Sequence, residues 1–300
     1  MVDLRKPALP ASTLRSSQPA SLPPRDNSSR EFVFSTADFE RVRKLIYQHA
    51  GISLSPVKQD MVYSRLARRL RATGMSSFAE YLDMLERGGG DEWERFVNSL
   101  TTNLTSFFRE PHHFPIFAEH LRKIGTKRPV RVWCSAASTG EEPYSIAITV
   151  AETFGANMSH VSIVASDLDT NVLATAGKGV YPIERVEKLS PERLRKFFLR
   201  GTGSQEGFVS VRPELKQMVT FQRLNLLDTS YSVKGPLDII FCRNVMIYFD
   251  KPTQYKILSR FAPMMQPDGL MFAGHSESFL HAADLFKSQG KTVYSLAQGR

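Results

Sequence analysis

The segment from Val130 to Tyr144 constrains the fold of this 300-residue chain more than any other part. It reads Val-Arg-Val-Trp-Cys-Ser-Ala-Ala-Ser-Thr-Gly-Glu-Glu-Pro-Tyr, which predicts a short apolar strand, a turn of small residues and the start of a helix. Pro143 is tolerated there, because the first four N–H groups of a helix have no intrahelical partner. Such a strand, turn and helix are typical of an open parallel sheet that binds a nucleotide-like cofactor.

The residues of this turn narrow the choice of cofactor. Gly140 is its one glycine, so neither G-x-G-x-x-G nor G-x-x-x-x-G-K-[ST] is present. Glu141 and Glu142 would repel a pyrophosphate but tolerate a cofactor with positive charge, such as S-adenosylmethionine. A second apolar run, Val161 to Asp167, ends in an acid that is well placed to hydrogen-bond a ribose diol. Two ordinary strand–helix units with acids that cap helices are the alternative interpretation.

Composition limits the class of protein. Hydrophobic residues make up 42% and charged residues 23% of the chain, which fits one large or two modest globular domains. We find no apolar run of membrane-spanning length and no signal-peptide core, so we expect a cytoplasmic protein without direct membrane insertion. Cys134 and Cys242 fall in predicted buried strands, which predicts neither a disulfide framework nor a metal site. The net charge of +9 indicates an acidic partner: nucleic acid, anionic lipid or an acidic protein surface.

The pattern divides the chain into four parts. Residues 1–30 are rich in proline and serine and predict a disordered basic tail. Residues 31–102 show helical periodicity and predict a small all-α domain. Residues 103–111 form a polar linker, and in residues 112–300 strands alternate with helices, as in an α/β domain. The four helices expected in the N-terminal domain are Asp38–Ala50, Val57–Ala72, Met75–Glu86 and Glu92–Leu100.

The second of these helices carries a row of basic residues and, after Asp60, no acid. This face is either a docking surface for an acidic partner or an ordinary solvated surface. Its basic residues are Lys58, Arg65, Arg68 and Arg69.

Turn signals near residues 200–220 predict a small antiparallel insertion in the α/β domain. Its strands are expected at Phe208–Arg212 and Leu215–Phe221, after a helix at Pro191–Leu199. The exposed edge of such a hairpin could bind a peptide by strand addition, or the hairpin could be a passive surface feature.

The chemistry is indicated by the motifs that are missing. The strand from Leu237 ends in Arg243 and Asn244, without the Asn/Asp-Pro-Pro-aromatic turn of an amine methylase. Cys242 follows Phe241 inside the apolar strand, and is better interpreted as a core residue than as a nucleophile. A carboxylate acceptor needs no general base, because its pKa of about 4.3 leaves it ionised at pH 7. The groups expected to hold such an acceptor are Arg109 and Tyr248.

Four segments in sequence order resemble the bacterial chemotaxis receptor glutamate O-methyltransferases. They are Thr101-Thr-Asn-Leu-Thr-Ser-Phe-Phe-Arg-Glu, Ala136-Ala-Ser-Thr-Gly-Glu-Glu-Pro-Tyr-Ser, Ala165-Ser-Asp-Leu-Asp-Thr and Phe241-Cys-Arg-Asn-Val-Met-Ile-Tyr-Phe. The resemblance covers about residue 32 to the C-terminus. It implies a class I S-adenosylmethionine-dependent methyltransferase domain, Rossmann-like α/β, with a small antiparallel β-subdomain, preceded by a small all-α domain.

The resemblance also implies a reaction and a site. The enzyme would esterify glutamates on the cytoplasmic helices of chemoreceptors, giving glutamate 5-O-methyl ester and S-adenosylhomocysteine in sensory adaptation. Tyr248 would lie beside the acceptor, and the basic helix would dock on the receptor. A receptor's C-terminal peptide would bind at Arg200, Gly201, Gly203 and Gly207, and we expect a monomer. The cofactor would be bound by Asn103, Thr105, Arg109, Glu141, Asp167, Asn225, Leu226, Arg243 and Asn244.

Two alternatives stay open at this point. A nucleic-acid methylase is favoured by the net charge of +9 and opposed by the missing acceptor motifs. A non-catalytic adaptor would use the hairpin and the basic helix as docking surfaces, but the presence of Arg109, Asp167, Asn244 and Tyr248 argues against it.

Overall fold

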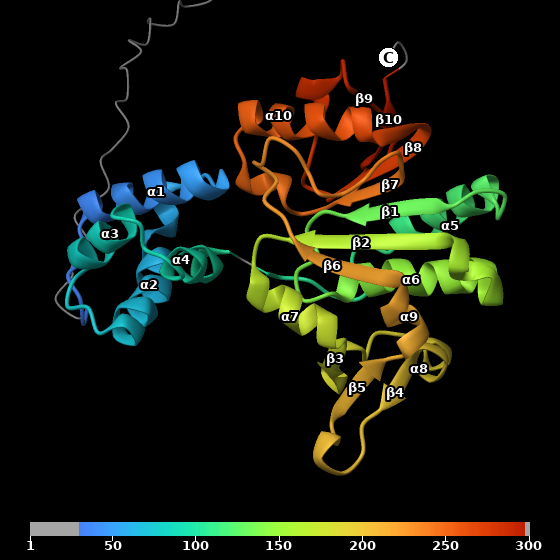
Figure 1. The fold of residues 1–300 in the computed structure, drawn as a ribbon, viewed down its shortest axis with the longest axis horizontal. Helices are drawn as coiled ribbons and strands as arrows, with labels where there is room; N and C mark the ends of the chain where they lie inside the picture. Colours follow the sequence, from blue (N-terminus) through green and yellow to red (C-terminus); the bar gives the residue numbers. More distant parts are fainter. Residues whose placement is uncertain (1–29, 102, 298–300) are drawn as a thin grey trace, which may run out of the picture.

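The computed structural model describes residues 30–101 and 103–297. The predicted tail therefore lies outside the described residues, apart from Arg30. Figure 1 shows a small helical domain beside the carboxyl ends of the strands of a larger α/β domain. The helical domain contains α1 (Thr36–Ala50), α2 (Gln59–Thr73), α3 (Phe78–Glu86) and α4 (Glu92–Leu100).

The ends of these helices follow from their capping residues. Ser35 and Asp38 form a capping box at the start of α1, and Gly51 ends it with a φ of 68°. Along α2, Val62, Leu66 and Leu70 are fully buried, as the four-residue spacing of the apolar side chains predicts.

The α/β domain is built on a seven-stranded sheet with the order β6-β2-β1-β7-β8-β10-β9. All neighbouring strands pair in parallel except β10, which is antiparallel to both β8 and β9. The strand order reverses between β1 and β7, which is where open α/β sheets bind ligands. The strands are β1 (Val130–Cys134), β2 (Val161–Asp167), β6 (Val219–Arg223), β7 (Leu237–Cys242), β8 (Met265–Ala273), β9 (Phe286–Ser288) and β10 (Val293–Leu296).

The two faces of the sheet carry separate hydrophobic cores. Val132 and Phe241 point into a core shared with α5 (His113–Ile124) and α6 (Glu141–Phe154). Trp133, which follows Val132, and Ile240, which precedes Phe241, point into the opposite core against α10 (Lys251–Phe261). The alternation of side chains along a strand explains why these strands read as continuous apolar runs.

A second, three-stranded sheet has the order β3-β5-β4 and is antiparallel (Figure 1). Its strands are β3 (Val180–Pro182), β4 (Phe198–Arg200) and β5 (Phe208–Val211), and α7 (Thr170–Lys178) and α8 (Pro191–Phe197) precede the first two of them.

The predicted hairpin partner of β5 is wrong. Residues expected to form the strand Leu215–Phe221 instead form α9 (Pro213–Met218) and then β6, a parallel strand at the edge of the large sheet. Pro213 begins α9 because its fixed φ suits the first helical turn. The antiparallel insertion begins near residue 180, earlier than the expected 200, because β3 is its first strand and pairs with β5.

The two domains contact each other directly. Tyr47 donates its hydroxyl hydrogen to Asp250 at 2.7 Å, and the amide of Asn225 donates to the carbonyl of His49 at 2.9 Å. The backbone N–H of Ser53 donates to the carbonyl of Tyr248 at 2.8 Å. Among the described residues, no helix has the length and apolar character needed to cross a bilayer.

Candidate active site

A deep cavity lies at the carboxyl ends of β1, β2, β6 and β7, and residues of the N-terminal domain close one side of it. It is open to solvent on one side, and its wall combines apolar side chains with a few polar ones, as small-molecule sites do. Ten of the residues predicted for the site lie on its wall: Lys58, Asn103, Thr105, Arg109, Asp167, Asn225, Leu226, Arg243, Asn244 and Tyr248.

The turn after β1 brings its backbone against the acid that ends β2. Ser138 has a φ of 47°, and its N–H donates to Oδ2 of Asp167 at 2.8 Å. The N–H of Asp169 donates to Oδ1 at 3.0 Å. Burial raises the pKa of Asp167, and these backbone donors partly offset that effect. The carboxylate is thus fixed in one orientation at the cavity wall, and its remaining lone pairs can accept from a ligand.

Glu141, expected near the amino group of the methionine moiety, is not on the cavity wall. Its buried carboxylate accepts from Thr139 Oγ1 at 2.6 Å and pairs with Arg185 at 3.0 Å. The next residue, Glu142, lines the cavity instead. Consecutive helical side chains point about 100° apart, so only one of two adjacent glutamates can face the cavity.

Arg243 directly follows β7 and contacts both the linker and α6. It is buried, with 3% of its surface exposed, and its guanidinium contacts Glu142 directly. Nη2 also donates to the carbonyl of Arg109 at 2.5 Å and lies 3.4 Å from Oε2 of Glu110. If one member of such a buried group of charges is removed, the remaining charge is left buried without a partner, which strongly destabilises the fold. Arg243 therefore holds the linker against α6 and the sheet.

The linker contributes polar groups to the cavity wall next to the turn after β1. The side-chain amide of Asn103 donates to Oδ2 of Asp169 at 2.9 Å, and the backbone carbonyl of Asn103 accepts from Ser138 Oγ at 3.3 Å. Nη1 of Arg109 donates to the carbonyl of Leu104 at 2.7 Å, which leaves other guanidinium hydrogens for a ligand. Thr105 is 9% exposed and completes this wall.

The N-terminal domain adds a cation to the mouth of the cavity. Nζ of Lys58 lies 5.6 Å from the ring centroid of Tyr248, and both residues line the cavity. However, two of the basic residues predicted for this docking surface already bind partners within the N-terminal domain or the start of the linker. Arg65 donates to the carbonyls of Ser99 and Thr101 at 3.3 and 2.6 Å, and Arg69 forms a two-pronged pair with Glu92 at 2.8 Å. Arg68 is exposed.

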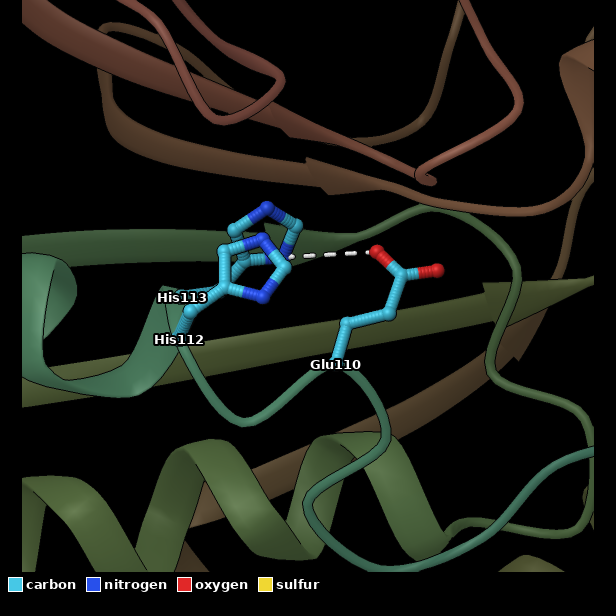
Figure 2. Close-up of side chains that lie close together, drawn as sticks. All are labelled: Glu110, His112 and His113. Carbon is cyan, nitrogen blue, oxygen red and sulfur yellow. Dashed lines mark ion pairs between the residues drawn. The ribbon is translucent and has the colours of Figure 1, made fainter.

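Glu110 lies beside the cavity in a cluster with two histidines, drawn in Figure 2. Nδ1 of His113 lies 3.8 Å from Oε2 of Glu110. Burial, with the nearby charge of Arg243, lowers the pKa of His113 to about 4, so this contact is not an ion pair at neutral pH.

The cluster is poorly suited to a divalent metal. Nε2 of His113 is 2.9 Å from the carbonyl of Lys291, which assigns it a proton and ties up one potential ligand atom. Arg243 also places a positive charge next to Glu110. Although burial opposes ionisation, hydrogen bonds from His275 and the charge of Arg243 lower the pKa of Glu110 to about 2.

Neither cysteine has the properties of a nucleophile. Cys134 and Cys242 are fully buried, and burial raises the pKa of both thiols above the ordinary value. Their interpretation as core residues is confirmed.

The residues expected to bind a receptor peptide lie at the end of β4 and in the loop between β4 and β5, and none of them lines the cavity. Arg200 is exposed at the end of β4, an edge strand. The N–H of Gly201 donates to the carbonyl of Phe208 at 2.8 Å, which closes the loop that follows. Gly203 and Gly207 have φ values of 58° and 84°.

Two acids that organise the site, Glu110 and Glu277, had no role predicted from the sequence, and Glu142 was predicted to suit a cationic cofactor only together with Glu141. Glu110 and Glu142 contact Arg243, and Glu277 accepts from the backbone of Asn244. Glu110 and Glu142 directly follow residues that were singled out, which is a usable signal. Glu277 lies in a loop after β8 with no pattern around it.

Comparison with known proteins identifies the family. Residues 103–295 match the model "CheR methyltransferase, SAM binding domain", and residues 37–101 match "CheR methyltransferase, all-alpha domain". The chain is 53% identical over 273 residues to the chemotaxis protein methyltransferase of Salmonella typhimurium, covering 91% of this chain and 94% of the relative. It is 52% identical over 280 residues to chemotaxis protein methyltransferase 2 of Pseudomonas aeruginosa, covering 93% and 100%.

These matches confirm the predicted resemblance, the class I fold and the cofactor S-adenosylmethionine. The chain belongs to the CheR methyltransferase family, as an enzyme with an all-α N-terminal domain and an S-adenosylmethionine-binding domain.

Proposed function

We propose that this chain methylates specific glutamate side chains on the cytoplasmic helices of chemoreceptors, a reaction that is consistent with relatives named as chemotaxis protein methyltransferases. The products are glutamate 5-O-methyl ester and S-adenosylhomocysteine, and the reaction serves sensory adaptation in the cytoplasm. The observation that carries the proposal is the meeting of Arg109 and Tyr248 in one cavity with the residues expected to bind the cofactor.

The wall of the cavity fits the cofactor. Its small side chains at Ser135 and Ala136 allow close approach to the backbone, and Asp167 offers a fixed carboxylate to the ribose. Glu142 takes the place expected for Glu141 near the methionine amino group. The remaining cofactor contacts are assigned to Asn103, Thr105, Arg109, Asn225, Leu226, Arg243 and Asn244, which line the same cavity.

Bound S-adenosylmethionine supplies an electrophilic methyl group, whose bond to sulfur breaks as a bond to the acceptor oxygen forms. The acceptor glutamate is already ionised at neutral pH, so the enzyme has no proton to remove. Arg109 and Tyr248 orient the acceptor carboxylate in line with the methyl group. Because the charges of methyl donor and acceptor cancel in the transition state, alignment and exclusion of water provide most of the rate enhancement.

The receptor docks at the mouth of the cavity. Lys58 and Arg68 supply positive charge for an acidic receptor helix, whereas Arg65 and Arg69 are engaged within the domain and contribute mainly to its rigidity. Leu104 on the cavity wall is 74% exposed, Val57 beside Lys58 is 73% exposed, and Ile247 beside Tyr248 is 51% exposed. Exposed apolar side chains of this kind suit the apolar face of a receptor helix.

A receptor's C-terminal peptide binds the small sheet by adding a strand to the outer edge of β4. Exposed Arg200 is available for the peptide's carboxylate groups, and Leu199 and Phe208 are 42% and 40% exposed beside it. Gly201, Gly203 and Gly207 shape the adjoining loop. Such tethering raises the local concentration of receptor for a monomeric enzyme without changing the chemistry.

The test compares methyl transfer to chemoreceptor membranes by wild type, Tyr248→Phe and Arg109→Ala. We expect Tyr248→Phe to lower kcat/KM for the receptor while the Kd for S-adenosylhomocysteine stays within about twofold. We expect Arg109→Ala to lower kcat by roughly 100-fold, because a carboxylate that is no longer held in line with the methyl group loses the contribution of alignment. Arg122→Ala, which removes an exposed arginine of α5, is the matched control. Full activity in both site variants would contradict the assignment.

A further inference from the structure

A buried carboxylate that no recognised motif contains lies directly behind the cavity. Glu277 follows β8, and 5% of its surface is exposed. Its Oε1 accepts from the N–H of Met246 at 2.7 Å, and its Oε2 accepts from the N–H groups of Asn244 and Gly274 at 2.9 and 2.5 Å. These hydrogen bonds join the loop after β8 to the loop after β7.

The backbone that Glu277 holds is in an unfavourable conformation. Asn244 has a φ of 58°, in the left-handed region, which asparagine adopts more readily than other residues with a Cβ but which is still less favourable than the extended or right-handed regions. The same residue lines the cavity, between Arg243 and Tyr248 along the chain. A conformation of this kind persists only where surrounding contacts over-determine it. Two of the three hydrogen bonds to Glu277 come from this turn, at Asn244 and Met246.

The loop after β8 packs closely against the Glu277 carboxylate and the turn after β7. A Cβ on Gly274 would lie 2.4 Å from Nδ2 of Asn244 and 2.9 Å from Oε2 of Glu277. The loop after β8 therefore approaches the turn as closely as a glycine backbone allows. On the other side, Glu110 accepts from Nδ2 of Asn244 at 3.3 Å. Asn244 is fixed through its backbone by one acid and through its side chain by another.

We propose that Glu277 is a positioning residue for the cofactor site, holding the turn that contains Arg243, Asn244 and Tyr248 in its binding geometry through three backbone hydrogen bonds. The inference rests on the proposed use of this cavity for S-adenosylmethionine. It assigns Glu277 an effect on ligand affinity that is separate from its effect on folding.

The test uses Glu277→Gln in the full chain. An amide of the same size keeps one acceptor oxygen but turns an NH₂ donor toward backbone N–H groups, so at least one of the three hydrogen bonds is lost. Asp238→Asn is the matched control, because Asp238 is equally buried and accepts from the N–H of Arg131 at 2.8 Å. It lies at the opposite, amino-terminal end of β7, away from the cavity.

Calorimetry with S-adenosylhomocysteine, at a temperature where each variant is folded, gives the decisive readout. We expect Glu277→Gln to raise the Kd about tenfold, equivalent to about 1.4 kcal/mol, and Asp238→Asn to leave it within about twofold while lowering the melting temperature. Glu277→Asp, which keeps the charge on a shorter side chain, should restore part of the affinity.

A fourth variant, Asn244→Ala, separates failure of this inference from failure of the site assignment. If Asn244→Ala weakens S-adenosylhomocysteine binding and Glu277→Gln does not, the positioning role is overturned. If neither variant changes the Kd, the assignment of the cavity itself is wrong. Equal loss of affinity in Glu277→Gln and Asp238→Asn would reduce Glu277 to a general stabilising residue and also overturn the proposal.

Discussion

Removal of the Arg243 side chain should destabilise the α/β domain strongly. Arg243 is buried between Glu142, which is 8% exposed, and Glu110, whose side chain is 9% exposed. Arg243→Ala leaves these two carboxylates without their cation and the carbonyl of Arg109 without a donor. Loss of one partner of a buried ion pair costs about 3–5 kcal/mol. With a urea m-value of about 2–3 kcal/mol/M, the unfolding midpoint should fall by about 1–2.5 M.

The two tryptophans of the chain allow this measurement to be confined to one domain. Trp133 is fully buried in the α/β domain, and Trp93 belongs to the helical domain. In a Trp93→Phe background, fluorescence during urea unfolding reports on the α/β domain alone. Arg193→Met is the matched control, because its pair with Glu152 is about one-third exposed and should contribute about 1 kcal/mol or less.

A double-mutant cycle tests the physical cause. If the orphaned charge of Glu142 causes much of the loss, Glu142→Gln should cost less in the Arg243→Ala background than in wild type, with a coupling energy of about 1–3 kcal/mol. A cost below about 1 kcal/mol for Arg243→Ala, or strict additivity with Glu142→Gln, would refute the argument that Arg243 neutralises two buried acids.

Three further predictions concern ligand binding, the small sheet and pH. Asp167→Asn should raise the Kd for S-adenosylhomocysteine about tenfold or more by calorimetry, because the fixed carboxylate is lost from the cavity wall; an unchanged Kd would remove Asp167 from the site. Gly201→Ala should lower the melting temperature more than Gly203→Ala, because a Cβ on Gly201 would lie 2.0 Å from the Gln205 carbonyl oxygen, whereas one on Gly203 meets open space and costs only the strain of its φ of 58°. Equal effects would contradict the close approach at Gly201. The pKa of Glu110 is lowered from 4.5 to about 2, so the stability it contributes is present above pH 4.5 and is lost as the pH falls toward 2. Urea midpoints measured at pH 6 and pH 3 should therefore differ more for wild type than for Glu110→Gln, and an equal difference would show that Glu110 does not titrate as the structure implies.

Local patterns in the sequence predicted much of the fold. The spacing of Val62, Leu66 and Leu70 predicts the buried face of α2, and small residues after β1 predict a ligand turn. The small sheet was partly missed because β3 and β4 have three residues each, too few to show an alternating pattern. The Pro213 segment was misassigned because a six-residue helix likewise shows no clear period.

The candidate site was predictable to the level of segments, and less so to the level of single side chains. Glu141 and Glu142 are equivalent in sequence, and the rotation of α6 decides which of them faces the cavity. Arg69 appeared unpaired because its partner Glu92 lies on another helix. Glu277 gave no signal, since its importance lies in backbone hydrogen bonds across 31 and 33 residues of sequence.

The central claim is carboxyl methyl esterification of a receptor glutamate by this cavity. Its most direct test is incubation of the purified chain with radiolabelled S-adenosylmethionine and chemoreceptor-containing membranes, followed by mild base. The account predicts labelled receptor that releases volatile methanol in base, and loss of that label with Arg109→Ala. Base-stable label on nucleic acid, or cofactor binding without any transfer to receptor, would contradict it.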